Sequence, residues 1–483
     1  MTTDALWIIP LGLAATGLGY GIVPVNRLGW VSGIAGAFLL FWLVALPLRL
    51  WQGTGPLTTW FFVIVAILSI FGIWYSGPYI TREAREHHWS ERRVKGYYVF
   101  FMLFIGSLSA LAIWTNFIFL WMAIEAATLT STVLTAHPAS RGAVEAAWQY
   151  IVVTELGGLV ALLGTLLSLT AVGIPLFAWS FVPAHQTLSG VHQHWALIGA
   201  YMALVGYGTK AGLAPFHTWL PDAHSEAPAP VSALLSGLKL AGAMFIVYRL
   251  FHVLALSLPP AYLKDALIVL GLLSLVIAAG SLAVQRDLKR LWAYSSIEHI
   301  GLISLGMGFG GIALVGAFLH IWTHAASKTL LFHNAGTVRI LYHSSHSDHG
   351  ARGILHRTPW TGALLALGSA AIVGLPPFAP FWSEWLILAG GLRQVGDRPA
   401  AIAAGALIVL IFIAIARRVP GWLFTPGQVG TSLPNTIQEP LGLILPNAVL
   451  GVFVLGGGIG FPLLVHPLWH HVVLQLVSQQ GGG

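Results

Sequence analysis

The chain has 483 residues, of which 57% are hydrophobic and only 8% are charged. Soluble globular proteins carry about 25% charged residues, so this chain cannot cover itself with a water-compatible surface, and we expect a polytopic membrane protein. The net charge of +7 does not indicate nucleic-acid binding, because the basic residues sit in short loops between apolar runs. Cysteine is absent, which excludes disulfides, thiol catalysis and a cysteine-ligated iron–sulfur cluster.

Apolar runs of the length needed to cross a bilayer, about 20 residues, follow one another along the whole chain. The first has no basic region of a cleaved signal peptide before it, so we expect it to be retained. The polar stretches between runs, the longest at 77–96 and 342–358, are too short for a soluble domain. We predict an all-α bundle of about 14 transmembrane helices over residues 5–24, 29–48, 57–76, 97–114, 116–135, 144–172, 193–216, 229–251, 264–284, 288–308, 311–341, 359–392, 400–416 and 440–466.

Two runs contain residues that break a helix. The run at 359–392 exceeds one membrane thickness and contains Gly374-Leu-Pro-Pro377, and the run at 193–216 ends in Gly212 and Pro215. The breaks are about 160 residues apart, which indicates a tandem repeat of about five spans, and such repeats are commonly inverted in transporters. We predict an N-terminal three-helix segment (1–96), a first repeat of helices 4–8 (97–251), a second repeat of helices 9–13 (252–418), and helix 14 with a tail (419–483).

The basic residues of the loops segregate by side. We number the loops between the fourteen predicted helices in chain order. The even-numbered loops and the neighbouring helix ends hold Arg49, Arg249, Lys264, Arg393 and Arg398. Odd-numbered loops hold Arg27, Arg82, Arg85, Arg92, Arg93, Lys95, Arg141, Arg286, Lys289, Arg290, Arg352, Arg357, Arg417 and Arg418. The positive-inside rule then places the odd loops in the cytoplasm and both termini on the outer side.

Many ionisable residues fall within the apolar runs. They are Glu125, Glu155, Glu298, Glu384, Lys210, Lys239, Lys328, Arg339, His299, His320, His324 and His333. A charge at bilayer depth costs a few kcal/mol even on lenient scales, so a set of this size needs a polar or aqueous path. Carboxylates, amines and imidazoles in such surroundings can exchange protons near neutral pH. The pattern therefore predicts proton transfer across the membrane.

For three of these residues, the surrounding sequence indicates a role and one alternative to it. Glu125 lies about ten residues into its span, near mid-membrane, and the alternative is a carboxyl satisfied by Thr128. Lys210 precedes the glycine and prolines of the first break, where an opened helix can line a polar cavity; the alternative is a lysine that reaches the interface. Glu384 follows the second break, where the alternative is an interfacial carboxylate.

His320, His324 and Lys328 have i, i+4, i+8 spacing and share one helix face. A histidine pair at i, i+4 can bind a metal, but the sequence shows no third ligand and the lysine would repel a cation. We therefore expect no metal or cofactor, and favour a hydrogen-bonded proton wire over histidines that each bind a backbone carbonyl. His299 and His333 are equally open to either role.

The stretch Lys210-Ala-Gly-Leu-Ala-Pro-Phe-His-Thr-Trp-Leu-Pro-Asp-Ala-His-Ser-Glu-Ala-Pro-Ala-Pro-Val-Ser-Ala-Leu-Leu-Ser-Gly237 resembles the signature of the proton-translocating, antiporter-like membrane subunits of respiratory complex I and group 4 hydrogenases. Matches at His324-Ala-Ala-Ser-Lys328 and Gly374-Leu-Pro-Pro-Phe-Ala-Pro-Phe-Trp-Ser-Glu384 agree with it. Glu298 and His299 after Tyr-Ser-Ser-Ile most resemble the component F branch of hydrogenase-4-type complexes. The resemblance covers residues 100–390.

This resemblance implies fourteen helices, two inverted five-helix repeats, and breaks in the seventh and twelfth helices. By position, Glu125 is similar to the glutamate of the fifth helix and Lys210 to its partner on the seventh. Lys328 is similar to the relay lysine of the eleventh helix and Glu384 to the outward half-channel residue of the twelfth. In the implied mechanism, protonation of the relay lysine alters the Lys210–Glu125 attraction and drives proton release on the opposite side.

Two positions depart from the family pattern. The lysine that many relatives carry in the eighth helix falls two residues after Lys239, at Ala241. Two residues turn about 200° on a helix, which would turn Lys239 away from the relay. Gln149 replaces a frequent sixth-helix lysine, and nearby Glu155 is a candidate substitute. We keep Glu125, Lys210, Lys239, Glu298, His320, His324, Lys328 and Glu384 as the predicted proton relay.

Three functions follow as hypotheses. The first is a proton-translocating subunit of a hydrogenase-4-like or NADH:quinone oxidoreductase-like complex in a bacterial or archaeal inner membrane. It would have no redox centre of its own and would partner other membrane subunits and a soluble redox arm. The second is a cation/proton antiporter subunit, or the membrane partner of an inorganic-carbon uptake system. The third is a structural anchor that has lost pumping, which the departures at Ala241 and Gln149 keep open.

Overall fold

The computed structural model describes residues 8–24, 28–45, 55–175, 190–255, 257–346, 350–425, 436–464 and 473. Over these residues the chain is helical, and its one β-bridge joins Asp287 to His346. Arg27, Arg49 and both termini lie outside the described residues. The predicted all-α fold is confirmed.

Each predicted apolar run corresponds to a helix or to a pair of helices. Among the described residues, eight helical segments are long and apolar enough to cross a membrane by length and composition. Other spans are shorter or broken. In chain order the principal helices are α1 (Ile8–Ile22), α2 (Leu28–Ala45), α3 (Pro56–Glu86), α4 (Glu91–Ile113), α5 (Phe117–Ala136), α6 (Arg141–Val172), α7 (Val191–Ala211), α8 (Leu220–Glu226), α9 (Ala229–Leu234), α10 (Leu240–Leu254), α11 (Pro260–Leu282), α12 (Leu288–Phe309), α13 (Gly311–Tyr342), α14 (Ile354–Arg357), α15 (Pro359–Ile372), α16 (Ala379–Arg393), α17 (Arg398–Leu423) and α18 (Leu441–Leu464).

Several of these helices begin directly after a polar N-cap residue, whereas the hydropathy pattern alone does not locate their first residue. The Ser90 hydroxyl accepts from the Arg93 N–H at the start of α4, and Asn116 accepts from the Ile118 N–H at 2.9 Å at the start of α5. Helix α3 continues to Glu86, so the stretch 77–96 is mostly helical, and only residues 87–90 connect α3 to α4. The predicted polar loop was wrong because charged residues continue a helix beyond the apolar run.

The two predicted breaks share one geometry. Gly212 after α7 and Gly374 after α15 both adopt left-handed backbone angles, with φ of 75° and 69°. In each case the next N–H bonds back five residues: Leu213 to the Gly208 carbonyl at 2.9 Å, and Leu375 to the Ala370 carbonyl at 3.2 Å. Prolines follow both glycines and keep the helix from continuing. The division into two five-helix repeats stays a prediction.

Helices α6 and α7 pack along a glycine seam. A methyl group on Gly164 would lie 2.6 Å from the Gly199 carbonyl oxygen, and one on Gly206 would lie 2.6 Å from the Ala161 Cα. Such distances are shorter than any ordinary van der Waals contact. The two backbones therefore meet closely over several turns.

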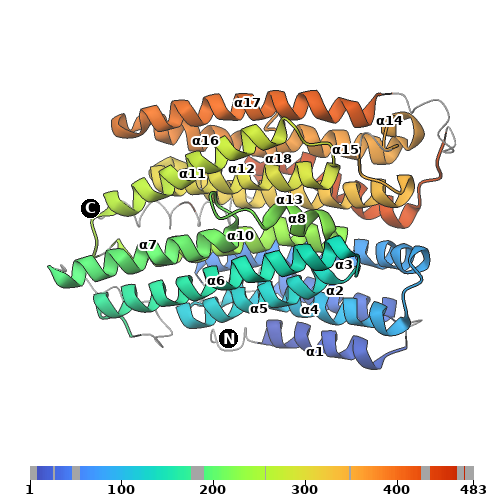
Figure 1. Ribbon diagram of the computed structural model, residues 1–483, viewed down its shortest axis with the longest axis horizontal. Coiled ribbons are helices and arrows are strands. Elements are labelled where there is room, and N and C mark those ends of the chain that lie inside the picture. The colour runs from blue at the N-terminus through green and yellow to red at the C-terminus, as the bar shows by residue number, and fades with distance from the viewer. Residues whose placement is uncertain are drawn as a thin grey trace.

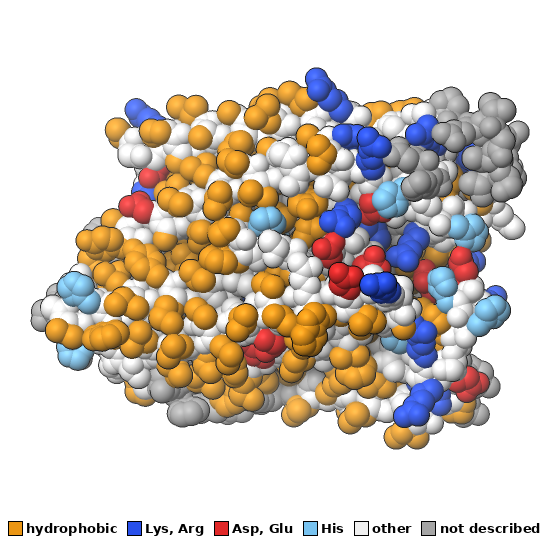
Figure 2. All heavy atoms as spheres, in the orientation of Figure 1, with side chains coloured by type: hydrophobic (Ala, Val, Ile, Leu, Met, Phe, Trp, Pro, Cys, Tyr) orange, Lys and Arg blue, Asp and Glu red, His pale blue; other side chains and the backbone are white. Residues whose placement is uncertain are grey.

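Helix α13 lies inside the bundle and contacts α3, α12, α16 and α18 (Figure 1). Between α9 and α10 the chain makes a π-turn, Leu235–Lys239, against α13. Hydrophobic side chains cover most of the face in Figure 2, and charged and histidine side chains gather toward the end at which α14 lies. Large apolar residues such as Leu156, Leu159 and Ile402 are exposed, as expected for a multi-pass membrane protein with lipid around it.

Candidate functional site

Lys210 and Glu125 form a buried ion pair. The Lys210 Nζ lies 2.7 Å from the Glu125 Oε2 and also donates to the Thr128 hydroxyl at 3.3 Å. Lys210 is fully buried and Glu125 is 8% exposed. The Thr128 hydroxyl itself donates to the Ile124 carbonyl, so the carboxylate is satisfied by lysine rather than by Thr128. The predicted partners from α5 and α7 are therefore in contact.

Gly158 on α6 makes room for this pair. A methyl group there would lie 2.8 Å from the Lys210 Cε and 2.9 Å from the Glu125 Cδ. Glu155, one turn earlier on α6, interacts electrostatically with both members of the pair. A second carboxylate thus acts on the ion pair from α6.

Lys239 points toward the same pair. It is fully buried, and its Nζ lies 4.8 Å from the ring centroid of Tyr150 and 4.7 Å from that of Trp219. Its Nζ has no hydrogen-bond partner among the described residues, so the two rings are its main stabilising contacts. Lys239 also interacts electrostatically with Lys210 and Glu125, which argues against the expectation that it turns away from them.

Lys328 and Glu298 form a second buried group between α12 and α13. The Lys328 Nζ donates to the Trp292 carbonyl at 2.6 Å and lies 5.9 Å from that residue's ring centroid. The Glu298 carboxylate accepts from the Ser295 hydroxyl at 3.5 Å and interacts electrostatically with Lys328.

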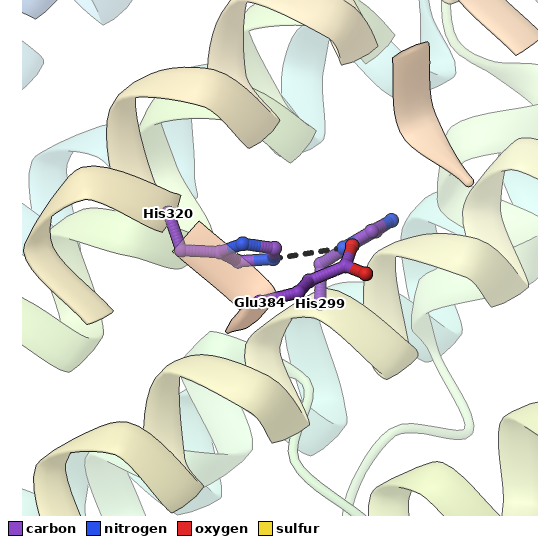
Figure 3. Close-up of side chains that lie close together, drawn as sticks. All are labelled: His299, His320 and Glu384. Atoms are coloured by element: carbon purple, nitrogen blue, oxygen red, sulfur yellow. Dashed lines mark hydrogen bonds between the residues drawn. The ribbon is translucent and has the colours of Figure 1, made fainter. Parts of the chain in front are cut away.

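Three histidines and Glu384 continue this group toward α16. The rings of His299 and His320 are 5.0 Å apart, with a 2.9 Å contact between Nδ1 and Nε2, and His324 lies 5.1 Å from His299 (Figure 3). Glu384 points at the same place from α16. The predicted face of His320, His324 and Lys328 therefore lines one buried polar region. His299, which the sequence left open, belongs to it.

The two groups are joined by residues that the sequence analysis did not select. His224 on α8 is fully buried and interacts electrostatically with both Lys239 and Lys328. The hydroxyls of Ser236 and Ser296 lie 2.7 Å apart and link the π-turn to α12. His224 lies inside the long motif, but only the fold shows that it is near enough to interact with both lysines.

His333 lies outside this region. Its ring stacks on Tyr75 at 4.0 Å, and its Nδ1 contacts the Asn447 Oδ1 at 3.1 Å. It therefore packs between α3 and α18, whereas Lys328 on the same helix bonds to α12. The structure thus separates His333 from the other three intramembrane histidines of the prediction.

The sequence over residues 115–411 matches the family described as NADH:quinone oxidoreductase/Mrp antiporter, TM. The chain belongs to this family. Among its relatives, a hydrogenase-4 component F homolog of Methylacidiphilum infernorum is 32% identical over 406 residues, which cover 82% of this chain and 83% of that one. An NADH-quinone oxidoreductase subunit N of Roseiflexus castenholzii is 31% identical over 425 residues, covering 82% and 79%. The predicted family resemblance is confirmed.

Solved structures of family-like subunits share the fold. A chain of the archaeal membrane-bound sulfane sulfur reductase superposes with a TM-score of 0.84 at 20% identity, covering 99% of this chain and 98% of that one. A chain of respiratory complex I from Thermus thermophilus gives 0.72 at 22% identity, covering 97% and 99%. The relatives are named as components of multi-subunit membrane assemblies, which implies further membrane subunits for a member of this family.

Proposed function

We propose that this chain is a proton-translocating membrane subunit, driven by redox chemistry in partner subunits and without a redox centre of its own. The observation that carries the proposal is the buried 2.7 Å ion pair between Lys210 and Glu125, followed by two more buried lysines, Lys239 and Lys328. Relatives named as hydrogenase and NADH-quinone oxidoreductase components support the coupling to redox partners.

The mechanism is electrostatic. The attraction of Glu125 keeps Lys210 charged while the neighbouring lysines are neutral. Proton uptake at Lys239 and then Lys328 adds positive charge to a region of low dielectric, where repulsion between like charges is strong. His224, which interacts electrostatically with both lysines, and the hydroxyls of Ser236 and Ser296 provide groups through which a proton can move.

The proton then leaves Lys328 in the direction of Glu384. His324 is one turn from Lys328 on α13, and His320 is one turn further. From α12, His299 contacts both histidine rings and Glu298 interacts electrostatically with Lys328. Glu384 follows the second break, where the freed backbone can hold water. When Lys328 is charged while Lys210 stays charged beside Glu125, repulsion between the two lysines drives the Lys328 proton along this path to the outer side.

Protons fit the site better than sodium. Sodium binding requires several oxygen ligands around one space, whereas the Glu125 Oε2 is already occupied by the Lys210 ammonium. Around Lys328 the neighbours are the Trp292 carbonyl, the Glu298 carboxylate and the His324 imidazole, which do not surround one space with oxygen atoms. These groups accept and donate protons.

We further propose the two five-helix repeats at 97–251 and 252–418 and a location in a bacterial or archaeal inner membrane. The odd loops would face the cytoplasm and both termini the outer side. The matching breaks at Gly212 and Gly374 support the repeats, and the excess of arginine and lysine in the odd loops supports the orientation. The partners would be other membrane subunits and a soluble redox arm.

The test removes the ion pair as a unit, because loss of one partner alone would leave an uncompensated buried charge. In membrane vesicles carrying the whole complex, the double variant Lys210→Met/Glu125→Gln should lose proton uptake by at least about tenfold while the complex assembles. The control is Lys264→Met/Asp397→Asn, which removes another lysine–carboxylate pair, at 2.6 Å, near helix ends. It should transport normally. Retained proton uptake in the first variant would refute the proposal.

A further inference from the structure

The structure brings together His299, His320 and Glu384, which the sequence alone did not show to be neighbours. One ligand atom from each residue lies within 4.8 Å of the other two, and all three side chains are buried (Figure 3). They come from α12, α13 and α16. Two imidazoles and one carboxylate are a donor set that binds zinc in proteins with one position left for a further ligand.

Hydrogen bonds around His320 prepare its ring for metal binding. The Ser383 hydroxyl donates to the Pro380 carbonyl at 2.8 Å, so its oxygen accepts from the His320 Nδ1, which lies 2.8 Å away. His320 therefore carries its proton on Nδ1 and turns the lone pair of Nε2 toward His299 and Glu384. Metal-binding histidines usually have their second nitrogen fixed in this way.

His299 has a corresponding partner on its far side. Its Nδ1 faces the His320 Nε2 at 2.9 Å, and its Nε2 lies 3.8 Å from the Glu298 carboxylate. When the ring proton of His299 sits on Nε2 instead of Nδ1, it faces the Glu298 carboxylate as a hydrogen-bond donor. The lone pair of Nδ1 can then bind the ion. The result is a carboxylate–histidine–metal arrangement.

We propose that His299, His320 and Glu384 bind a divalent transition-metal ion of the zinc class, and that the bound ion blocks proton passage. In a tetrahedral zinc site, ligand atoms lie about 3.3 Å apart, so the His299 Nδ1 and the His320 Nε2, now 2.9 Å apart, separate slightly, while the Glu384 carboxylate closes on the ion by up to roughly 1.5 Å. His324 is fully buried, and neither of its ring nitrogens has a hydrogen-bond partner among the described residues. With its ring 5.1 Å from that of His299, it is the nearest candidate for the fourth ligand.

Lys328 does not prevent the binding of a cation. It lies eight residues, about 12 Å along the helix, from the ligand His320, and one turn from the candidate fourth ligand His324. Its Nζ is also held at the Trp292 carbonyl, six residues before Glu298. Two carboxylates, Glu384 as ligand and Glu298 behind His299, offset the charge of the ion. The absence of a third ligand, which argued against a metal in the sequence, no longer applies.

The blocking effect rests on the proposed function. A bound ion occupies the lone pairs through which His299 and His320 would pass a proton, and adds two positive charges between Lys328 and the outer side. Proton transport should therefore stop while the chain remains folded. Metal binding itself does not depend on transport.

The binding test uses the complex purified in detergent without a polyhistidine tag. Titration with zinc chloride, followed by calorimetry and metal analysis, should give about one tightly bound ion per chain. The variants His299→Gln and Glu384→Gln should each weaken binding at least tenfold. The control His333→Gln changes another buried histidine of α13 and should bind like the wild type. Equal zinc binding in wild type and the His299→Gln/His320→Gln variant would overturn the site.

Two further measurements keep the outcome interpretable. Copper(II) bound to the unaltered protein should show hyperfine coupling to at least two imidazole nitrogens in electron paramagnetic resonance, and a spectrum without nitrogen coupling would contradict the site. In vesicles, zinc should slow proton uptake by the wild type and by His333→Gln. If zinc binds with the predicted ligands but uptake is unchanged, the block is wrong. The Lys210→Met/Glu125→Gln variant should still bind zinc, so failure of the proposed function is separately visible.

Discussion

Gly158→Ala should impair proton transport without altering any titratable residue. The added methyl would lie 2.8 Å from the Lys210 Cε and 2.9 Å from the Glu125 Cδ, whereas carbon atoms prefer about 3.5–4.0 Å. If each side chain retreats by about 1 Å, the Nζ to Oε2 distance grows from 2.7 Å to roughly 4 Å. At an effective dielectric constant of about 20, the attraction weakens by about 2 kcal/mol. Since about 1.4 kcal/mol is a factor of ten in rate, transport should slow roughly thirtyfold.

The assay is proton uptake into membrane vesicles carrying the whole complex, with assembly checked by co-purification. The matched control is Gly157→Ala on the same helix, whose methyl would press against the Thr209 Cβ at 2.7 Å instead of the ion pair. We expect this variant to lose stability to a similar extent but to transport near the normal rate when assembled. Normal uptake by assembled Gly158→Ala, or equal loss in both variants, would show that the geometry of the pair does not control transport.

Two further changes test other parts of the structure. Gly374→Ala places a methyl 3.0 Å from the Glu384 Cδ at a residue with φ of 69°. We expect slower proton release, measured as uptake into vesicles, and a backbone strain of about 1–2 kcal/mol, measured by thermal unfolding. The control is Gly396→Ala, whose methyl would meet no other atom within 4 Å. At the end of α5, burial and then Arg93 lower the pKa of His137 from 6.5 to about 4. Between these pH values the unfolded chain binds a proton that the folded chain does not, so stability should fall by roughly 1–3 kcal/mol as pH drops through this window. His137→Gln should remove that dependence, and an unchanged pH profile of the melting temperature would contradict it.

Spans and breaks could be predicted from sequence because their signals are local. Hydropathy adds up over 20 residues, and glycine followed by proline ends a helix wherever it occurs. The pairing of Lys210 with Glu125 was also predictable, but only through the resemblance, since 85 residues separate them. Their contact depends on how α5 and α7 pack, which residue spacing alone does not give.

The parts that could not be predicted depend on packing between distant helices. The π-turn at Leu235–Lys239 has no sequence signature; it packs against α13, where a methyl group on Gly237 would lie 3.1 Å from the Ala325 carbonyl oxygen. Likewise, Glu384 joins His299 and His320 only because α16 packs on both α12 and α13. A search for a third ligand along one helix could not have found it.

The glycine seam between α6 and α7 constrains how any transport cycle can work. With backbones this close at Gly164, Gly199 and Gly206, the two helices cannot slide or rotate against each other without collision. Glu155 and Lys210 are therefore carried by two helices that can move only as one unit. A change in the distance between these two side chains must then come from their own rotations.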